Sequence, residues 1–395
     1  MVKPTRWPSL QQRRKLWVEV HLWLGLVLGG FLTIFGVTGA VLVFQSEIDH
    51  LINSAFFKAE VPPGAQRRSL DEIAQAAMRA APAHWESGGS TAPKDADENY
   101  IFGFWIEGGT PPPEEAVSIN IAVNPYTAQV VGRRVFYHAW NPFKHCFIGF
   151  FFKLHYALLL GDVGTTVVGI MALLLVISVL SGLILWWPLD GKWRRVLTIK
   201  RGASTVRFNH DLHQSVGFYA LVVLIAVLIS GVYFNLPDQF KWTVAQFSSL
   251  TPDPSPSPGR ALAPGVSIDR LLRMAETAYP GGTLNYFALP DPKTGLLNAC
   301  YSDVPSLRKY VVDMRCLTID ANRASVVLVA DPASGSAGDT FMQWQWPLHS
   351  GQAFGWTGRI LVMLSGLMCP LLFVTGILRW QHKRRARQTA AMRRA

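Results

Sequence analysis

The chain has 395 residues, half of them hydrophobic, and a formal net charge of +11. With a mean hydropathy of +0.21, it is too apolar for an ordinary soluble enzyme and too long for one small domain. Four apolar stretches approach or exceed the length that crosses about 30 Å of hydrocarbon. They lie at 16–44, 163–187, 216–236 and 360–380, so we predict a polytopic membrane protein.

The basic residues indicate how these spans are oriented. Residues 1–20, 189–212 and 379–395 hold 18 of the 37 Lys and Arg but only three of the 26 Asp and Glu. The positive-inside rule therefore places both termini in the cytoplasm and both long loops outside. Because the excess positive charge follows from this topology, we expect no nucleic-acid partner. The first span is expected to be uncleaved, since its apolar run is too long for a signal peptide and no small-residue cleavage site follows Phe44.

We therefore expect a membrane α-helical fold, with four transmembrane helices formed by a duplicated two-helix unit and two small α+β domains outside the membrane. In chain order the expected segments are a cytoplasmic N-terminus (1–15), the first span (16–49), the first outer domain (50–153), the second span (154–188), a cytoplasmic loop (189–212), the third span (213–236), the second outer domain (237–348), the fourth span (349–382) and a cytoplasmic tail (383–395).

Four histidines occupy matched positions in the duplicated unit. In the first and third spans the histidine precedes a glycine by four residues and a Thr-Gly or Ser-Gly pair by 17 and 18. In the second and fourth spans it precedes glycines at +6 and +9, a Ser-Gly or Thr-Gly pair at +26 and +27, and a tryptophan at +31. The matched sets are His21, Gly25, Thr38 and Gly39 with His213, Gly217, Ser230 and Gly231, and His155, Gly161, Gly164, Ser181, Gly182 and Trp186 with His349, Gly355, Gly358, Thr375, Gly376 and Trp380.

The topology predicts how the histidines pair. Spans one and three run outward, so His21 and His213 lie at the cytoplasmic edge, while His155 and His349 lie at the outer edge. A parallel duplication relates its halves by an axis along the membrane normal, so equivalent histidines face each other at equal depth. Two pairs of imidazoles are what two bis-histidine haems of the b type require, and such closed coordination suits electron transfer. Zinc is the competing metal, but the sequence has no tight Cys/His cluster for it.

The outer histidines raise a question of distance. His155 precedes the polar Asp162 by seven residues, and His349 precedes Arg359 by ten. Straight helices would carry these ligands roughly 10–15 Å beyond the apolar stretch. Bends at the glycine pairs that follow each histidine, or helix tilt, would shorten this gap.

Small residues and one arginine complete the predicted haem sites. Each Thr-Gly or Ser-Gly pair lies at the opposite end of its span from that span's histidine. We predict that Gly39 and Gly231 approach the outer haem and that Gly182 and Gly376 approach the inner one, where a flat macrocycle can lie against backbone. Ordinary small-residue helix packing is the alternative. Arg359 lies on the outer side, where topology does not favour positive charge, and is the predicted propionate partner.

The two outer loops also resemble each other. Ser69 and Ser267 each precede an Ala-rich or amphipathic helical run with an early acid, which predicts capped helices. Strand-like alternation follows in each loop, so we expect a helix followed by a small antiparallel sheet. Cys300 and Cys316 flank a predicted hairpin and can form a disulfide if the compartment is oxidising. A Pro-rich linker is expected at 251–258.

The motifs His21-Leu22-Trp23-Leu24-Gly25 and Leu212-His213, followed by Gly217, with helix–sheet domains between the spans, make the chain resemble the PepSY-associated transmembrane family. Members of this family are iron-regulated bacterial inner-membrane proteins, and they include ferric-siderophore reductases of the ferrioxamine-reductase type. The resemblance implies PepSY-like domains in the periplasm and a ferric siderophore as acceptor, from which reduced Fe(II) is released. Gly/Pro-rich stretches at 86–97 and 108–113 depart from the family pattern.

These observations predict an oxidoreductase in contact with membrane lipid, which carries electrons from a cytoplasmic reductase or quinol to the periplasm. The chain has no Gly-rich nucleotide fingerprint, so a nicotinamide or flavin would belong to another protein. Two alternatives remain: a non-enzymatic scaffold that binds a periplasmic partner such as a peptidase, and an iron–siderophore permease. Haem content separates the first hypothesis from the other two.

Other side chains have two interpretations each. The basic side chains near the cytoplasmic ligands can bind propionates or an acidic donor, or only follow the topology. The tryptophans near the outer ligands can form a landing surface or anchor the membrane interface. Histidines without counterparts are surface, supporting or substrate-site residues. The basic side chains are Arg194, Arg195 and Arg207, and the tryptophans are Trp140, Trp344 and Trp346. The histidines are His138, His145 and His210.

Overall fold

The computed structural model describes residues 10–82, 85–106, 116–138, 146–188, 191, 193–200, 202–252 and 262–394. The stretch at 108–113, Trp140, His145 and the linker from residue 253 lie outside this part. The chain forms two compact units, one helical (1–43, 154–240 and 348–395) and one built around a sheet (44–153 and 241–347).

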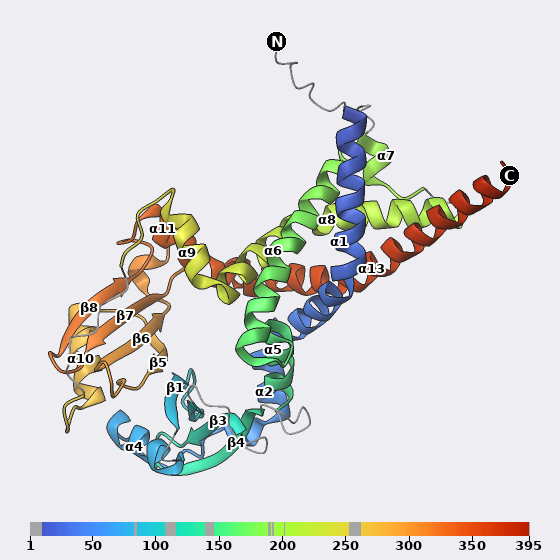
Figure 1. Cartoon of the computed structure of the whole chain (residues 1–395). Coiled ribbons are helices and arrows are strands. Elements are labelled where there is room, and N and C mark those ends of the chain that lie inside the picture. The colour runs from blue at the N-terminus through green and yellow to red at the C-terminus, as the bar shows by residue number, and fades with distance from the viewer. Residues whose placement is uncertain are drawn as a thin grey trace. The chain divides into compact units, whose positions relative to one another are not determined.

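The helical unit consists of four long helices, each with a segment apolar and long enough to cross a membrane. The first half contributes α1 (Leu10–Leu42) and α6 (Gly161–Trp186), and the second half contributes α8 (Thr205–Asn235) and α13 (Gly355–Met392). Both α1 and α8 pack against α6 and α13 (Figure 1). The four helices thus form a ring in which α1 and α8 are diagonal, as are α6 and α13.

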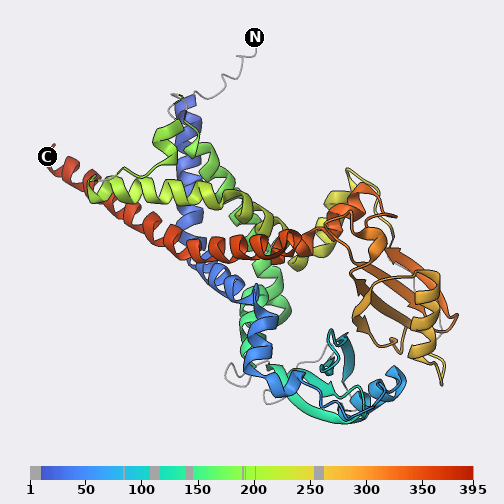
Figure 2. The ribbon, with the colours of Figure 1, turned by 180° about the vertical axis from the view of Figure 1, so that it is seen from behind.

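The closest helix crossing joins the two halves. A Cβ built on Gly36 of α1 would lie 2.5 Å from the backbone oxygen of Gly366 in α13. Glycine is therefore required there for the backbones to approach, as in other membrane helix pairs with small residues at their crossing. Cys369 is buried at the same crossing, so it has a packing role. Beyond it, α13 continues as one helix to Met392 (Figure 2).

The chain bends before α6 and before α13, as the glycines in these positions predict. Helix α5 (Phe147–Ala157) carries His155 and ends in a turn with positive φ at Leu158, Leu159 and Gly161. Helix α12 (Gln345–Ser350) carries His349 and is followed by Gly351, a short 3₁₀ turn (Gln352–Phe354) and Gly355, with φ values of 77° and 54° at the two glycines. The outer histidines therefore stand on short helices of their own.

The two outer loops do not form separate small domains but one eight-stranded antiparallel sheet of order β4-β3-β2-β1-β5-β6-β7-β8. Each loop supplies the expected helix followed by four strands, and the two edge strands β1 and β5 pair with each other. An edge strand exposes unpaired backbone groups, and joining the edges satisfies them. The strands are β1 (Glu86–Thr91), β2 (Tyr100–Trp105), β3 (Ala116–Val123), β4 (Val130–His138), β5 (Thr283–Ala288), β6 (Leu296–Ser302), β7 (Arg315–Asp320) and β8 (Ser325–Ala330).

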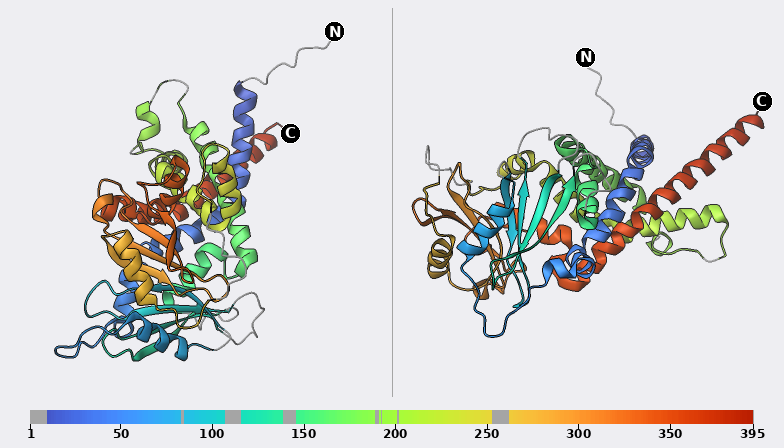
Figure 3. Two further views of the ribbon diagram at one scale, coloured as in Figure 1. Left: turned by 90° about the vertical axis from the view of Figure 1, so that its left-hand side faces the viewer. Right: turned by 90° about the horizontal axis from the view of Figure 1, so that it is seen from below.

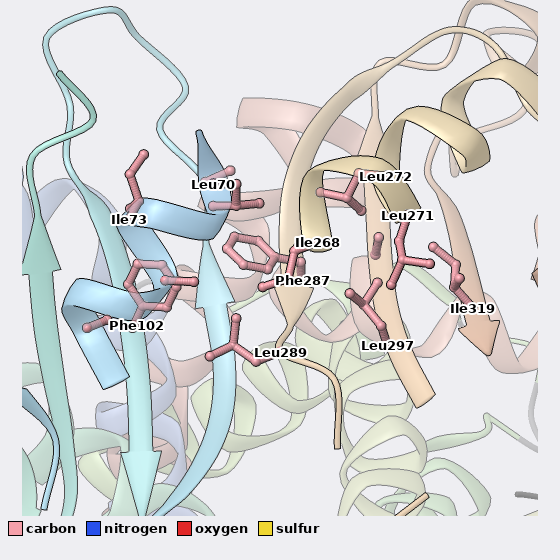
Figure 4. Packing of buried hydrophobic residues seen from close by; sticks show 14 of the residues in the cluster. Leu70, Ile73, Phe102, Ile268, Leu271, Leu272, Phe287, Leu289, Leu297 and Ile319 are labelled. Carbon is pink, nitrogen blue, oxygen red and sulfur yellow. The ribbon is translucent and has the colours of Figure 1, made fainter. Parts of the chain in front are cut away.

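Two helices cover the sheet over one shared core. Helix α4 (Leu70–Ala80) packs on β2–β4 and α10 (Ile268–Ala278) packs on β7 and β8 (Figure 3). Alternate strand residues point toward these helices and are fully buried, which is the period-two pattern of a sheet with one covered face. Figure 4 shows side chains from both loops in this core, among them Leu70, Ile73, Phe102, Ile268, Leu271, Phe287, Leu297 and Ile319.

The two helices also cap each other. Ser69 and Ser267 are N-caps, as predicted, and each accepts the amide N–H three residues on. In addition, the Asp71 carboxylate accepts the Ile268 N–H at 2.6 Å, and the Asp269 carboxylate accepts the Asp71 N–H at 2.9 Å. Carboxylates are favourable at helix N-termini, so this exchange ties one loop to the other.

Short elements and a disulfide complete the sheet unit. Cys300 and Cys316 face each other on β6 and β7 and form the disulfide that their spacing allows. The remaining helices of the chain are α2 (Gln45–Ile52), α3 (Ser54–Phe57), α7 (Trp193–Leu197), α9 (Pro237–Ala245), η1 (Pro305–Leu307) and α11 (Ala337–Gln343).

Candidate functional site

The four matched histidines come together in the two pairs that the internal repeat predicts. The ring centres of His21 on α1 and His213 on α8 lie 6.2 Å apart, and those of His155 on α5 and His349 on α12 lie 5.9 Å apart. The planes of each pair are steeply inclined, by 76° and 70°. Each pair therefore joins one half of the duplication to the other.

This spacing matches that of two imidazoles on one metal. With metal–nitrogen bonds of about 2 Å, rings bound through Nε2 on opposite sides of an iron have centres about 6 Å apart. Edge-to-face rings in direct contact also have their centres about 4.5–7 Å apart. The spacing of each pair is therefore compatible with one metal atom between the rings and with direct ring contact.

The Nδ1 atom of each histidine contacts a hydroxyl of the adjacent span in its own half. His155 Nδ1 lies 2.9 Å from Thr38 Oγ1, and the other three rings make equivalent contacts. These are His21 with Ser181 at 3.1 Å, His213 with Thr375 at 2.9 Å and His349 with Ser230 at 2.8 Å. The residue before each glycine of the Thr-Gly and Ser-Gly pairs thus anchors an imidazole.

The hydrogen-bond network around the four rings favours one tautomer. Each hydroxyl already donates its hydrogen to a carbonyl of its own helix: Thr38 to Ile34, Ser181 to Ser178, Ser230 to Ala226 and Thr375 to Leu371, at 2.6–2.7 Å. A hydroxyl has one hydrogen, so it can only accept from Nδ1. Nδ1 therefore carries the ring hydrogen, and Nε2 keeps the lone pair that binds a metal.

Two carbonyl groups support the same assignment. His21 Nδ1 also lies 2.9 Å from the Ser178 carbonyl, and His349 Nδ1 lies 3.1 Å from that of Val227. Carbonyl oxygens only accept hydrogen bonds, so the nitrogen opposite them is again the donor.

The predicted glycines lie directly against the imidazoles. A Cβ on Gly39 or Gly182 would lie 3.0 Å from Cε1 of His155 or His21, and one on Gly376 would lie 3.5 Å from that of His213. The fourth glycine, Gly231, is less crowded, because its Cβ would lie 3.9 Å from Cε1 of His349. We predicted these glycines to make room for a macrocycle, whereas the contact present is with the ring of one of the four paired histidines.

The two pairs lie near opposite ends of the helices. His21 and Thr38, which anchors His155, are 17 residues apart on α1, and His213 and Ser230 have the same separation on α8. At 1.5 Å per residue this is a rise of about 26 Å, close to the roughly 30 Å thickness of the hydrocarbon layer. The outer pair is thus level with the ends of α1 and α8 and does not project beyond them.

The sequence family described as the PepSY-associated TM region matches residues 18–383, which include all four histidines and their hydroxyl partners. The chain belongs to this family. No curated protein matches it.

The sequence His-Leu-x-Leu-Gly begins at His21, so in this PepSY-associated protein it includes one histidine of the inner pair. Its spacing to Thr38 then identifies the anchor of the outer pair. The hydroxyl residues are the functional groups that our sequence interpretation missed. The signal was present, because a Thr or Ser precedes the glycine in all four spans.

Arg359, the predicted propionate partner, is at the outer end of α13. It donates a hydrogen bond to the Val43 carbonyl at 2.9 Å and lies over the Trp356 ring at 4.9 Å. It therefore holds the end of α1 against α13. Whether it also binds a propionate is a prediction that these contacts do not address.

The remaining candidates separate into two groups. Near the inner pair, Arg207 is bound to the buried Asp211 carboxylate at 2.8 Å, and His210 Nδ1 lies 3.3 Å from the same carboxylate. In the sheet unit, His138 is buried and Trp346 is partly exposed. Within the described ranges no three His, Cys, Asp or Glu side chains come together as a metal group. Each histidine pair instead brings two imidazoles together, and two is the number of imidazoles in a bis-histidine haem site.

Proposed function

We propose that this membrane protein is a haem-containing oxidoreductase of the bacterial inner membrane. It passes electrons through two bis-histidine b-type haems to a periplasmic acceptor. The observation that supports the proposal is the set of four imidazoles anchored through Nδ1, in two pairs at a spacing that one iron atom can bridge.

The residues of the chain have distinct tasks in this function. When bound, each haem supplies a one-electron Fe(III)/Fe(II) couple. Each pair of imidazoles would hold one haem iron through two nitrogen ligands, which would leave no position for oxygen chemistry. The hydroxyls of Thr38, Ser181, Ser230 and Thr375 fix the ring orientation and raise the basicity of the ligands. The apolar cluster around Leu28, Leu175 and Leu228 lies between the two levels and excludes water.

The direction and the acceptor follow from charge and family. Basic residues concentrate at the His21/His213 ends of the helices, which favours the cytoplasm for that end. The Cys300–Cys316 disulfide favours an oxidising compartment such as the periplasm for the sheet unit. The resemblance favours a ferric siderophore, whose Fe(III) accepts one electron and leaves as the more weakly held Fe(II). A quinol or a cytoplasmic reductase would supply the electron.

The test is a reduced-minus-oxidised absorption spectrum of the full chain purified in detergent, with haem quantified per chain. We expect low-spin b-type bands and two haems. His21→Ala and His155→Ala should each remove one haem, with different spectra for the haem that remains. His210→Ala is the matched control, because it removes a histidine from α8 that has no counterpart in α1, and it should keep both haems.

Three results would contradict this function. A chain without haem, expressed with haem available, would leave the scaffold or permease as explanations. Retention of both haems in His21→Ala or His155→Ala would show that the ligand pairs are wrong. Two haems without reduction of ferric siderophore complexes would limit the proposal to another acceptor.

A further inference from the structure

Arg379 lies one helical turn beyond the residues of α13 that hold His213. It follows Thr375, which accepts the His213 Nδ1 hydrogen, by four residues, and Gly376, which lies against the same ring, by three. Residues three and four apart share a helix face. Arg379 therefore continues the face of α13 that forms the inner histidine site.

The charge of this arginine acts on the whole inner site. It interacts electrostatically with His21 and His213, which come from the two diagonal helices. The side chain is half-buried. Across the described ranges, no carboxylate forms an ion pair with Arg379.

Neither of the acidic residues that precede the inner histidines forms an ion pair with Arg379 in the described part of the chain. Asp211 is bound to Arg207 at 2.8 Å, and Glu19 acts on Lys383 through its charge. An arginine cannot lose its proton in a protein, and a desolvated charge without a counter-ion is unfavourable. Arg379 can therefore take an anion as its partner at the inner site.

We propose that Arg379 binds a carboxylate of the haem held by His21 and His213. This rests on the proposed function and adds a ligand-binding residue to it. A guanidinium matches a carboxylate in a bidentate geometry. The equivalent position of the first half, 30 residues after its outer histidine, is Leu185, so α6 carries no charged side chain at this position.

The test measures haem loss from the inner site. In a His155→Ala background, which leaves that haem alone, the rate of haem transfer to excess apomyoglobin is compared for Arg379→Gln and the parent. We expect loss to be about ten- to a hundredfold faster in the variant, as for a charge-assisted hydrogen bond. Arg387→Gln removes the same charge from an exposed site two turns further along α13 and should match the parent.

A second arm changes the ligand instead of the protein. Both chains are reconstituted with the dimethyl ester of the same haem, which lacks the carboxylates. Arg379→Gln should then have no effect on the rate, because the interaction needs both partners. If Arg379→Gln does not insert stably, Arg379→Lys is used instead, because it keeps the charge without the bidentate fork. With natural haem, its rate of haem loss should lie between those of the parent and of a variant without the charge. With the ester, its rate should equal that of the parent.

Equal loss of natural haem from the variant and the parent would overturn the inference while leaving the haem function intact. The same acceleration with the ester would also overturn it, since the arginine would then act through the fold or an anionic lipid headgroup. A wild-type chain without haem would overturn the proposed function, and the inference with it.

Discussion

A hydroxyl of the adjacent span contacts Nδ1 of each of the four paired histidines. Thr38→Val keeps the shape of the side chain but removes the acceptor of the His155 Nδ1 hydrogen. We expect haem affinity at the outer site to fall roughly 10–100-fold, as for other partners of metal ligands. Titration of the haem-depleted protein with haem, followed by absorption, measures this.

The matched control for this substitution is on the same helix. Thr33→Val removes a hydroxyl that bonds only the Gly29 carbonyl of α1, and its haem affinity should equal that of the wild type. Equal affinities for the Thr38 and Thr33 variants would show that the hydroxyl does not tune the ligand.

Gly39 packs directly against the imidazole ring of His155. Gly39→Ala would place a methyl group 3.0 Å from Cε1 of His155, so the ring or the helix must shift. We expect an altered low-spin electron paramagnetic resonance signal of the outer haem, or its loss, with the inner signal unchanged. Gly25→Ala meets no atom within 4 Å and should leave both signals as in the wild type. A normal outer signal in Gly39→Ala would contradict this role.

At the scale of elements, the reciprocal capping of α4 and α10 joins the two outer loops. Asp71→Ala removes the acceptor of the Ile268 N–H and of the Ser267 hydroxyl. We expect the free energy that stabilises the start of α10 to fall by about 1–2 kcal/mol, as for the loss of a helix cap. Faster amide hydrogen exchange in the first turn of α10, measured by mass spectrometry on the full chain, would report it.

The control for Asp71 is its neighbour. Glu72→Ala removes an exposed carboxylate that makes only a 3.8 Å surface ion pair with Arg68, which contributes little to stability. Exchange in α10 should be unchanged in this variant. If Asp71→Ala also left exchange in α10 unchanged, the loops would be joined by the sheet and its core alone.

At the scale of the sheet unit, a buried ion pair makes stability depend on pH. Burial by itself raises the pKa of Asp331, but hydrogen bonds from Arg315 and from the Ala333 and Ser334 backbone outweigh it, and the pKa lies below its usual value. A carboxylate with a lowered pKa contributes stability above its unfolded pKa of about 3.9 and loses it as the pH falls through the folded pKa.

We therefore expect amide protection in β7 and β8 to decrease as the pH drops below about 4. Asp331→Asn should weaken this pH dependence and destabilise the unit by roughly 3 kcal/mol at neutral pH, since Arg315 is left buried without its partner. Asp97→Asn is a control, because Asp97 and Lys58 form an exposed ion pair. In this variant, the amide protection of β7 and β8 should depend on pH as in the wild type. An unchanged pH profile in Asp331→Asn would assign the acid sensitivity to other groups.

For the molecule as a whole, repetition within the sequence predicted the spans, the four histidines and their pairing. Apolar length and matched spacing are local properties of the chain, and the twofold relation of the halves follows from them. The N-caps at Ser69 and Ser267 and the bends at Gly161 and Gly355 are equally local. Each depends on the side chain or backbone freedom of one or two residues.

What only the tertiary structure decided depends on contacts between distant segments. The hydroxyl–imidazole bonds, such as Thr38 with His155, join residues more than a hundred positions apart, and they establish the tautomer only because each hydroxyl also donates within its own helix. The merging of two small sheets at β1 and β5 had no sequence signal, since edge strands look alike whether or not they are paired. The unpaired charge of Arg379 likewise emerged only when the neighbouring carboxylates were found with other cations, because the free energy of a charge depends on what surrounds it.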